Sequence, residues 1–271
     1  MHNLPFTRLA GRPLWLAAVA GIVSFADQAY PTGKYYEAGK KLVTGEVNAA
    51  VEGLVASGVD DVLVWDGHGA GALLFEELHP AARLLHGRMN SFVHVMQDLV
   101  PTFDVAVMIG QHAMAGVATG NMNHTQDSQR IDYYKLNGRL IGEIGQFALF
   151  CGGYGVPLIF LSGDDAACAE AKDLAPNIGT VAVKQGICRG AAISLPMVEA
   201  RRRIREGIAD AVKRQRTRPV KPVQWPGPFV LEMRFFHTDD ADARAAQSGA
   251  TRIDQQTVSF VSAAVQDVVY R

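Results

Sequence analysis

The sequence predicts an α/β protein with a mostly parallel sheet and flanking helices, plus a smaller C-terminal α+β portion. Short apolar segments at residues 62–65, 104–109 and 156–161 each end in a polar turn that contains glycine. Helical segments separate them, and this alternation is typical of a parallel sheet covered by helices. Ligands of such sheets bind beyond the carboxyl ends of the strands, so we expect all three turns along one edge.

The helices are predicted from the spacing of apolar residues. Residues 35–58 place apolar side chains near a 3.6-residue period and end at Gly58. Residues 195–216 form a strongly basic helix, interpreted as a solvated face over an apolar stripe rather than an RNA-binding patch, because no aromatic residues interleave. Asn137-Gly138 is typical of a tight turn between two short strands. The helix that follows carries Glu143 in its first turn.

The last part of the chain mixes irregular and regular segments. Residues 217–228 contain four prolines, which indicates a linker or an edge segment. Residues 229–236 alternate like a half-buried strand, and residues 257–270 are predicted as a closing helix. We therefore divide the chain into an atypical leader (1–18), an α/β core (19–195) and a C-terminal portion (196–271).

Composition narrows the function classes. The chain has 271 residues, 48% of them hydrophobic, which is enough for a large core. Lysine and arginine number 26 against 27 acidic residues, so no global field attracts nucleic acid or anionic membranes. Three cysteines without metal-type spacing favour a reducing compartment, and we expect a cytoplasmic protein. The alternative is export, because Arg8 and Arg12 precede an apolar run with small residues before a cut after Ala26.

Four residues are the candidates for chemistry. His68 and His112 each follow a predicted strand, so two loops at the same sheet edge present imidazoles, the commonest neutral nitrogen ligands of zinc. Either histidine alone is more simply a hydrogen-bonded loop residue, but together they favour a metal site. His124 lies in a polar stretch that could carry a mobile acid or base. Glu143 is either a ligand or a residue that compensates the helix dipole.

The pair Asp164-Asp165 also follows a predicted strand. Adjacent carboxylates there could bind a metal, but they also cap the helix that follows, and we favour the cap. The chain has neither a Gly-x-x-x-x-Gly-Lys-Ser/Thr phosphate loop nor a Gly-x-Ser-x-Gly nucleophile elbow.

A series of short motifs follows the order found in the DppA-type D-aminopeptidases, and the chain resembles this family of zinc-dependent peptidases from about residue 19 to its C-terminus. The motifs lie at residues 19–24, 46–50, 62–69, 78–80, 110–113, 122–125, 137–138, 142–145, 162–165 and 183–185. The resemblance implies hydrolysis of short peptides with a D-amino acid at the amino end, two zinc ions per subunit and a ring-like homo-oligomer. It also implies that His68, His112 and Glu143 are zinc ligands and that His124 is the catalytic histidine.

The chain departs from this family at one motif. Family members begin with a strand that ends in Asp-x-Glu-Gly, whose Asp bridges two zinc ions and whose Glu binds one of them. In this sequence these positions fall on Trp15 and Ala17, and a shifted alignment offers only Ala18 and Ala20. Two of five expected ligands are therefore missing, and we expect one zinc ion or none. Asp27 is the nearest carboxylate that could substitute.

Two functions from different classes follow. The first is a metal-dependent aminopeptidase-like amide hydrolase that releases N-terminal D-amino acids from short peptides or aminoacyl amides and is impaired by the missing ligands. A weaker rival is a hydrolase for a non-peptide amide. The second is a catalytically inactive family member that acts as a binding or scaffold protein. The leader is a degenerate N-terminus, an export signal or the product of a wrong reading frame.

Overall fold

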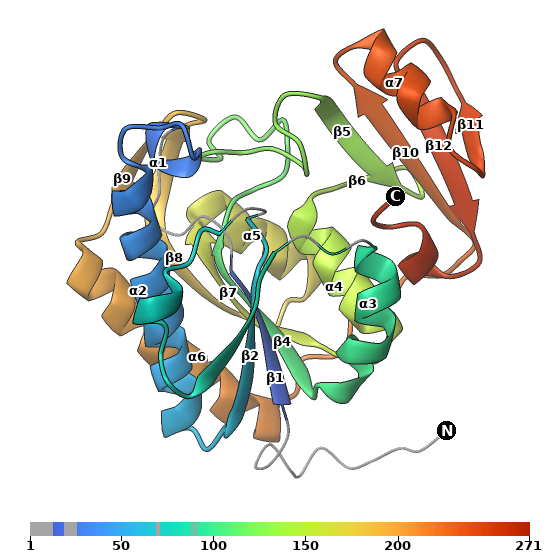
Figure 1. Cartoon of the computed structure of the whole chain (residues 1–271). Helices are drawn as coiled ribbons and strands as arrows, with labels where there is room; N and C mark the ends of the chain where they lie inside the picture. Colours follow the sequence, from blue (N-terminus) through green and yellow to red (C-terminus); the bar gives the residue numbers. More distant parts are fainter. Residues whose placement is uncertain (1–12, 19–25, 69–70, 88, 90) are drawn as a thin grey trace.

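The computed structural model describes residues 13–18, 26–68, 71–87, 89 and 91–271 and contains a mostly parallel seven-stranded sheet (Figure 1). The strand order is β3-β2-β1-β4-β7-β8-β9, and every pairing is parallel except that of β8 with β9. The predicted parallel sheet is confirmed. Its strands are β1 (Pro13–Ala18), β2 (Asp61–Asp66), β3 (Ala82–Leu85), β4 (Val105–Gln111), β7 (Leu158–Asp164), β8 (Gly179–Cys188) and β9 (Ala191–Ser194).

Helices cover both faces of this sheet (Figure 1). One face carries α2 (Tyr36–Ala56) and α6 (Met197–Thr217), which pack on each other. The other carries α3 (Phe92–Leu99), α4 (Glu143–Gly153) and α5 (Asp165–Leu174). Short helical turns complete the core at α1 (Ala26–Ala29), η1 (Phe75–Glu77) and η2 (Val100–Thr102). No helix among the described residues is both long and apolar enough to cross a bilayer.

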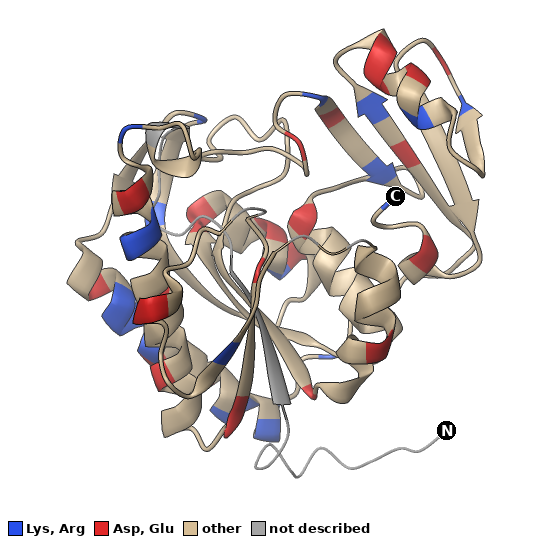
Figure 2. Ribbon diagram, in the orientation of Figure 1, with Lys and Arg blue, Asp and Glu red and all other residues tan. Residues whose placement is uncertain are grey.

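The basic helix α6 is amphipathic, as predicted. Its buried residues include Ala200, Ile204, Ile208 and Val212, which repeat at helical spacing and face the core. Most of its arginines, Arg202, Arg203, Arg205, Arg214 and Arg216, are exposed, and Figure 2 shows basic and acidic residues interspersed on this side of the molecule. Arg202 is an example, with a nitrogen 2.8 Å from Glu199 on the preceding turn. The interpretation as a solvated face over an apolar stripe is therefore confirmed.

The contact between α2 and α6 depends on a glycine, which leads to a stability prediction. A Cβ on Gly53 would lie 2.5 Å from Ile208 Cγ2 and closer still to the backbone oxygen of Arg205. Alanine is favoured over glycine in a helix by about 1 kcal/mol, but overpacking against backbone typically costs about 1–3 kcal/mol. We expect Gly53→Ala to lower the free energy of unfolding in urea titrations. Val55→Ala, on the exposed side of α2, is the control; equal stability of both variants would contradict the close packing.

The C-terminal portion contributes to a second, antiparallel sheet with the order β11-β12-β10-β5-β6. Its strands are β5 (Ile131–Leu136), β6 (Arg139–Ile141), β10 (Phe229–Phe235), β11 (Ala250–Arg252) and β12 (Thr257–Ser262), with α7 (Thr238–Ala245) packed on it. The predicted Asn137-Gly138 turn is confirmed, with φ angles of 52° and 79° that suit these residue types.

The predicted closing helix over residues 257–270 is wrong. Its first half is β12, which pairs with both β10 and β11, and only Val265–Asp267 forms a short helical turn, η3. The segment begins Thr-Val-Ser-Phe-Val, and its β-branched and aromatic residues fit a pleated sheet between two neighbours. Apolar spacing alone did not reveal those two partners, because both are distant in sequence or separated by a turn.

The strand β1 lies at the centre of the first sheet, between β2 and β4. It is formed by the last six residues of the predicted leader, and cleavage after Ala26 would remove it. The remaining leader residues and 19–25 lie outside the described part of the chain, and so do most of the apolar run and Ala20. Asp27 falls in α1, with its side chain outside the description. The division into leader, core and C-terminal portion stays a prediction, although β5 and β6 pair with the C-terminal sheet.

Candidate metal centre

Three of the four predicted residues converge beyond the carboxyl end of β4. One potential ligand atom from each of His112, His124 and Glu143 lies within 4.8 Å of the others. His112 follows β4 directly, His124 comes from the loop between β4 and β5, and Glu143 is the first residue of α4. Two imidazole nitrogens and a carboxylate oxygen form a typical donor set for zinc.

The His112 side chain is oriented as a metal ligand would be. Its Nδ1 lies 3.0 Å from the carbonyl oxygen of Ala113, and because a carbonyl can only accept, Nδ1 carries the hydrogen. The neutral ring then has its lone pair on Nε2, which is buried without a hydrogen-bond partner among the described residues. Burial, followed by the charge of His124, lowers the pKa of His112 to about 4. A neutral imidazole with a buried, unpartnered lone pair fits a bound cation.

His124 is held in a parallel way. Its Nδ1 is 2.7 Å from the carbonyl oxygen of Met122, so Nε2 again has the lone pair, 3.6 Å from Glu143 Oε1. The ring stacks on that of His112 with centroids 3.9 Å apart. Met122 and Gln126, on either side, have φ angles of 57° and 63°, which are uncommon for side chains with a Cβ. Such conformations cluster at functional sites where the surrounding structure enforces them.

The loop that carries His124 is anchored by Asp164, at the end of β7. One carboxylate oxygen of Asp164 accepts the backbone N–H of Ala167 at 2.7 Å, which caps α5, and the other accepts the N–H of Asn121 at 2.6 Å. The predicted helix cap is therefore confirmed, and the same carboxylate also positions the His124 loop. Asp165 accepts the N–H of Gly186 at 2.9 Å and ties β8 to this edge.

Glu143 enters the site because α4 begins at an unusually tight contact. A Cβ at Gly142 would lie 2.5 Å from Met114 Cβ, so only glycine allows this approach. Glu143 Oε1 accepts the N–H of Gln126 at 2.8 Å and lies 3.8 Å from His112 Nε2. Burial acts to raise the pKa of this carboxyl, but the electrostatic influence of His112, His124 and His68 together with the hydrogen bond from Gln126 outweighs burial and lowers the pKa. The group is thus an ionised carboxylate facing two imidazoles.

His68 lies at the same edge of the sheet but outside the closest group. It follows β2, and its backbone N–H donates to Asp66 Oδ1 at 3.2 Å, while Asp66 Oδ2 accepts from Leu73 at 3.3 Å. Burial lowers the pKa of His68, and the charges of Asp66, His124 and Glu143 also influence it. The predicted common edge for His68, His112 and residues 162–165 is confirmed by the parallel strands β2, β4 and β7. His68 as a ligand stays a prediction.

Glu170, on α5, is a buried carboxyl beside this site. Its Oε2 accepts the N–H of Met114 at 2.8 Å, while Oε1 is buried without a partner in the described residues. Burial raises the pKa of Glu170 from 4.5 to about 7. Sequence reasoning missed it, because only packing of α5 against the loop after β4 desolvates the side chain.

This carboxyl makes stability depend on pH. Between its unfolded and folded pKa values, about 4.5 and about 7, the folded state holds a proton that the unfolded state has released. The free energy of unfolding therefore falls as pH rises through that window. We expect Glu170→Gln to remove this dependence and to gain on the order of 2 kcal/mol on wild type between pH 5 and pH 8, in urea titrations of EDTA-treated protein. Glu76→Gln, exposed in η1, is the control, and parallel pH profiles of wild type and Glu170→Gln would refute the assignment.

The supporting residues differ in how far the sequence could reveal them. Asp66 stands two residues before His68 in Asp-Gly-His, a spacing typical of a local Asx turn. Asn121 and Gln126 carry no such signal, because the groups that they contact lie on other elements.

Comparisons with known proteins extend these observations. A family model described as D-aminopeptidase matches residues 18–271. The D-aminopeptidase of Bacillus subtilis (strain 168) is 36% identical over 225 residues, which are 82% of this chain and 80% of the relative. The solved structure of the Zn-dependent D-aminopeptidase DppA from Bacillus subtilis, a self-compartmentalizing protease, matches with a TM-score of 0.85 and 31% identity over 95% of this chain and 94% of that chain. The family match includes all four candidate residues and begins after Trp15 and Ala17.

Proposed function

Because this chain belongs to the D-aminopeptidase family, we propose that it is a zinc-dependent hydrolase that releases N-terminal D-amino acids from short peptides. The observation that carries the proposal is the convergence of His112, His124 and Glu143, with the lone pair of His112 Nε2 buried and unpartnered among the described residues. An orphaned buried acceptor costs about 1–3 kcal/mol, and a metal ion bound at this atom would offset that cost.

We propose that His112 and Glu143 hold the ion together with His68, as the family resemblance implies. The closest group in the structure contains His124 instead of His68, so His124 is the competing third ligand. When bound, zinc supplies a Lewis acid that polarises the scissile carbonyl and lowers the pKa of a bound water. Three protein ligands leave a coordination position for that water.

The residues themselves define the proton path. The carbonyl of Met122 keeps the Nδ1 hydrogen of His124 in place, so a proton can only be accepted and released at Nε2. In the proposed role, Nε2 takes a proton from the attacking water and delivers it to the nitrogen of the leaving amine. Glu143 accepts the N–H of Gln126, which aligns the His124 loop with the start of α4. The hydrogen bond from the Asn121 N–H to Asp164 holds the other end of this loop.

We propose that at most one zinc ion binds per subunit. The strand β1, Pro-Leu-Trp-Leu-Ala-Ala, contains no carboxylate, although it lies between the two strands that lead to His68 and His112. A second ion at this edge would lack the negative charge that the missing motif supplies in the family. The same observation favours the second candidate function, a binding or scaffold protein that retains the fold but no longer hydrolyses peptides.

Metal content and hydrolysis separate the two functions. We expect purified protein to contain about one zinc ion per chain by elemental analysis and to hydrolyse D-alanyl-p-nitroanilide, with L-alanyl-p-nitroanilide as the control for stereochemistry. EDTA should abolish hydrolysis and added zinc should restore it. Protein that neither retains zinc nor turns over the D-substrate when zinc is supplied would establish the scaffold function instead.

Two further properties belong to the proposal. The relative of known structure is a self-compartmentalizing protease, and we propose that this chain likewise forms a ring-like homo-oligomer, which light scattering after size exclusion would test. We propose a cytoplasmic location, because cleavage of an export signal after Ala26 would remove the central strand β1.

A further inference from the structure

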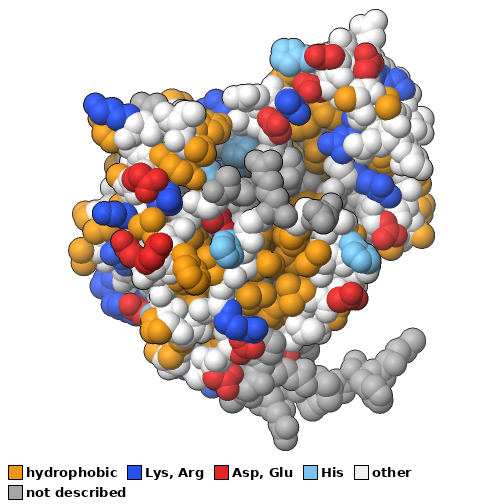
Figure 3. All heavy atoms as spheres, in the orientation of Figure 1, with side chains coloured by type: hydrophobic (Ala, Val, Ile, Leu, Met, Phe, Trp, Pro, Cys, Tyr) orange, Lys and Arg blue, Asp and Glu red, His pale blue; other side chains and the backbone are white. Residues whose placement is uncertain are grey.

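A small apolar cavity opens beside Glu143. It has a volume of about 240 Å³. Glu143 lines it together with five large apolar or aromatic residues, Trp65, Met108, Phe147, Phe92 and Tyr270. These residues come from β2, β4, α4, α3 and the C-terminal segment, so the cavity exists only in the folded chain. The space-filling view shows apolar side chains gathered over the region between β2 and α3 (Figure 3).

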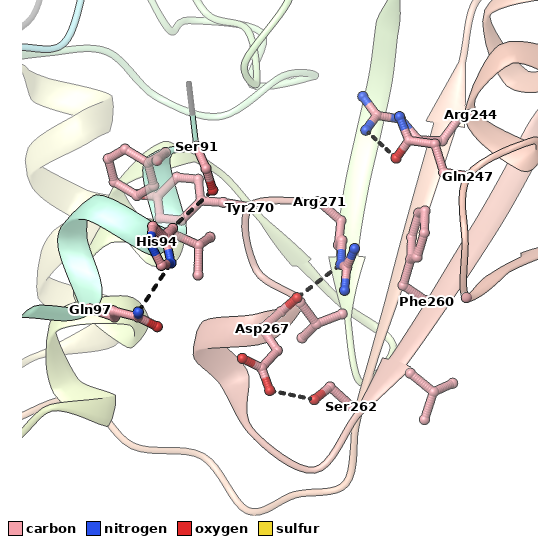
Figure 4. A pocket seen from close by; sticks show the side chains of 15 residues that line it. Ser91, His94, Gln97, Arg244, Gln247, Phe260, Ser262, Asp267, Tyr270 and Arg271 are labelled. Carbon is pink, nitrogen blue, oxygen red and sulfur yellow. Dashed lines mark hydrogen bonds between the residues drawn. The ribbon is translucent and has the colours of Figure 1, made fainter. Parts of the chain in front are cut away.

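A larger cleft lies on the other side of Phe92 and Tyr270. It has a volume of about 650 Å³, separates α3 from the second sheet and also includes Phe92 and Tyr270 in its lining (Figure 4). The two rings meet edge to face with centroids 4.6 Å apart, and each also lies 5.4 Å from the ring of fully buried Phe150. Phe92 and Tyr270 therefore form a wall shared by the cavity and the cleft.

The cleft differs from the cavity in charge. Arg244 and Arg271 line it, and their described partners are neutral, the side chain of Gln247 at 3.3 Å and the backbone oxygen of Asp267 at 3.0 Å. Figure 4 shows the Arg271 side chain in the middle of the cleft and that of Arg244 near its upper rim. The acidic side chain of Asp267 accepts a hydrogen bond from Ser262 at 3.3 Å. Asp267 also lines the cleft, but neither guanidinium forms an ion pair with an acidic side chain in the described structure, so both can attract an anion.

From this geometry we propose that cavity and cleft form one substrate groove across the Phe92–Tyr270 wall. The apolar cavity takes a bulky side chain on the amino-terminal residue, and the cleft takes the remainder of the peptide, whose free carboxylate lies near Arg244 and Arg271. The ligand is thus a short peptide with an aromatic or branched aliphatic first residue. This inference rests on the proposed function for the direction of the peptide, since the scissile amide must lie at Glu143.

Binding to metal-free protein tests the apolar end independently of hydrolysis. Isothermal titration of the full chain in EDTA should show D-phenylalaninamide binding at least about tenfold more tightly than D-alaninamide, because differences of a few methylenes in an apolar pocket discriminate by such factors. Met108→Trp, which fills the cavity, and Phe92→Ala, which removes half of the wall, should each reduce this ratio to near one. Phe75→Ala is the matched control, because Phe75 is exposed and stacks on His86 outside both hollows; it should keep the ratio.

The charged end has its own comparison. D-phenylalanyl-glycine should bind several-fold more tightly than its C-terminal amide, and Arg244→Gln should lower that preference, whereas Arg218→Gln, outside the cleft, should not. Two results in folded wild type would each overturn the proposed groove. One is equal binding of D-phenylalaninamide and D-alaninamide, and the other is equal binding of D-phenylalanyl-glycine and its C-terminal amide. A groove that binds as expected in a chain that hydrolyses nothing with zinc would leave this inference standing and the proposed function refuted. If wild type hydrolyses D-aminoacyl substrates but shows neither binding preference, the proposed function stands and this inference is refuted.

Discussion

Replacing His112 by alanine is expected to remove both zinc and hydrolysis. His112 Nε2 is a buried lone pair with no partner in the described structure, and burial holds the pKa of the ring near 4, so the side chain stays neutral at pH 7 and available to a cation. Loss of one of three protein ligands leaves two donors, fewer than a catalytic zinc site uses. Zinc per chain should fall to near zero by elemental analysis, and turnover of D-alanyl-p-nitroanilide should fall by at least about 10²-fold.

His124→Ala separates the two assignments of the third ligand. If His124 carries the proton, the variant should retain zinc and lose about 10²–10⁴-fold in rate. His68→Ala should then lose both zinc and activity. If His124 is the ligand instead, His124→Ala should lose both zinc and activity, and His68→Ala should retain zinc and lose rate. His237→Ala, exposed at the start of α7 and outside both hollows, is the control for loss of an imidazole. Comparable turnover in wild type and His124→Ala with zinc supplied would rule out any catalytic role for this residue.

The second large effect is a gain. Ala17 is in register with Trp65 on β2 and with Met108 on β4, two residues that line the cavity beside Glu143. The family resemblance places the missing Glu at this position and the missing Asp at Trp15. We expect Trp15→Asp/Ala17→Glu to raise zinc content by one ion per chain and to increase D-aminopeptidase activity at least about tenfold, because two carboxylates offset the charge of a second cation.

The uncharged pair Trp15→Asn/Ala17→Gln is the matched control for this gain. Both double variants place polar groups in the central strand, so both should lower the thermal midpoint in EDTA. Only the Asp/Glu variant should regain stability when zinc is added, because binding to the folded state alone raises the midpoint. Identical zinc content and identical thermal response of the two variants would show that these positions no longer face a metal site.

The fold is predicted correctly for elements whose local sequence pattern agrees with the packing partners that they have in the structure. The parallel strands β2, β4 and β7 were predicted as short apolar runs that end in glycine-containing turns, and α2 and α6 as amphipathic helices. Residues 257–270 show the opposite case. Their composition is compatible with a helix or a strand. The first part of the segment is a strand because it pairs with β10 on one side and β11 on the other.

The candidate site was predicted to a similar degree. The rule that parallel strands present their carboxyl ends at one edge placed His68, His112 and Asp164 together. It could not place His124 or Glu143 relative to them, because both depend on a long loop whose course is determined by distant contacts. Asn121 to Asp164, Gln126 to Glu143 and the tight approach of Gly142 to Met114 determine that course.

The sequence by itself determined the class of the protein, its family and the residue types at the sheet edge, since periodicity, turn chemistry and motif order are local properties of the chain. Only the tertiary structure decided that the carbonyls of Ala113 and Met122 direct both Nε2 atoms toward Glu143. It also decided that Glu170 is desolvated and that Phe92 and Tyr270 line both the cavity beside Glu143 and the larger cleft. These features arise from contacts between residues far apart in sequence, and burial and hydrogen-bond geometry exist only once those contacts form.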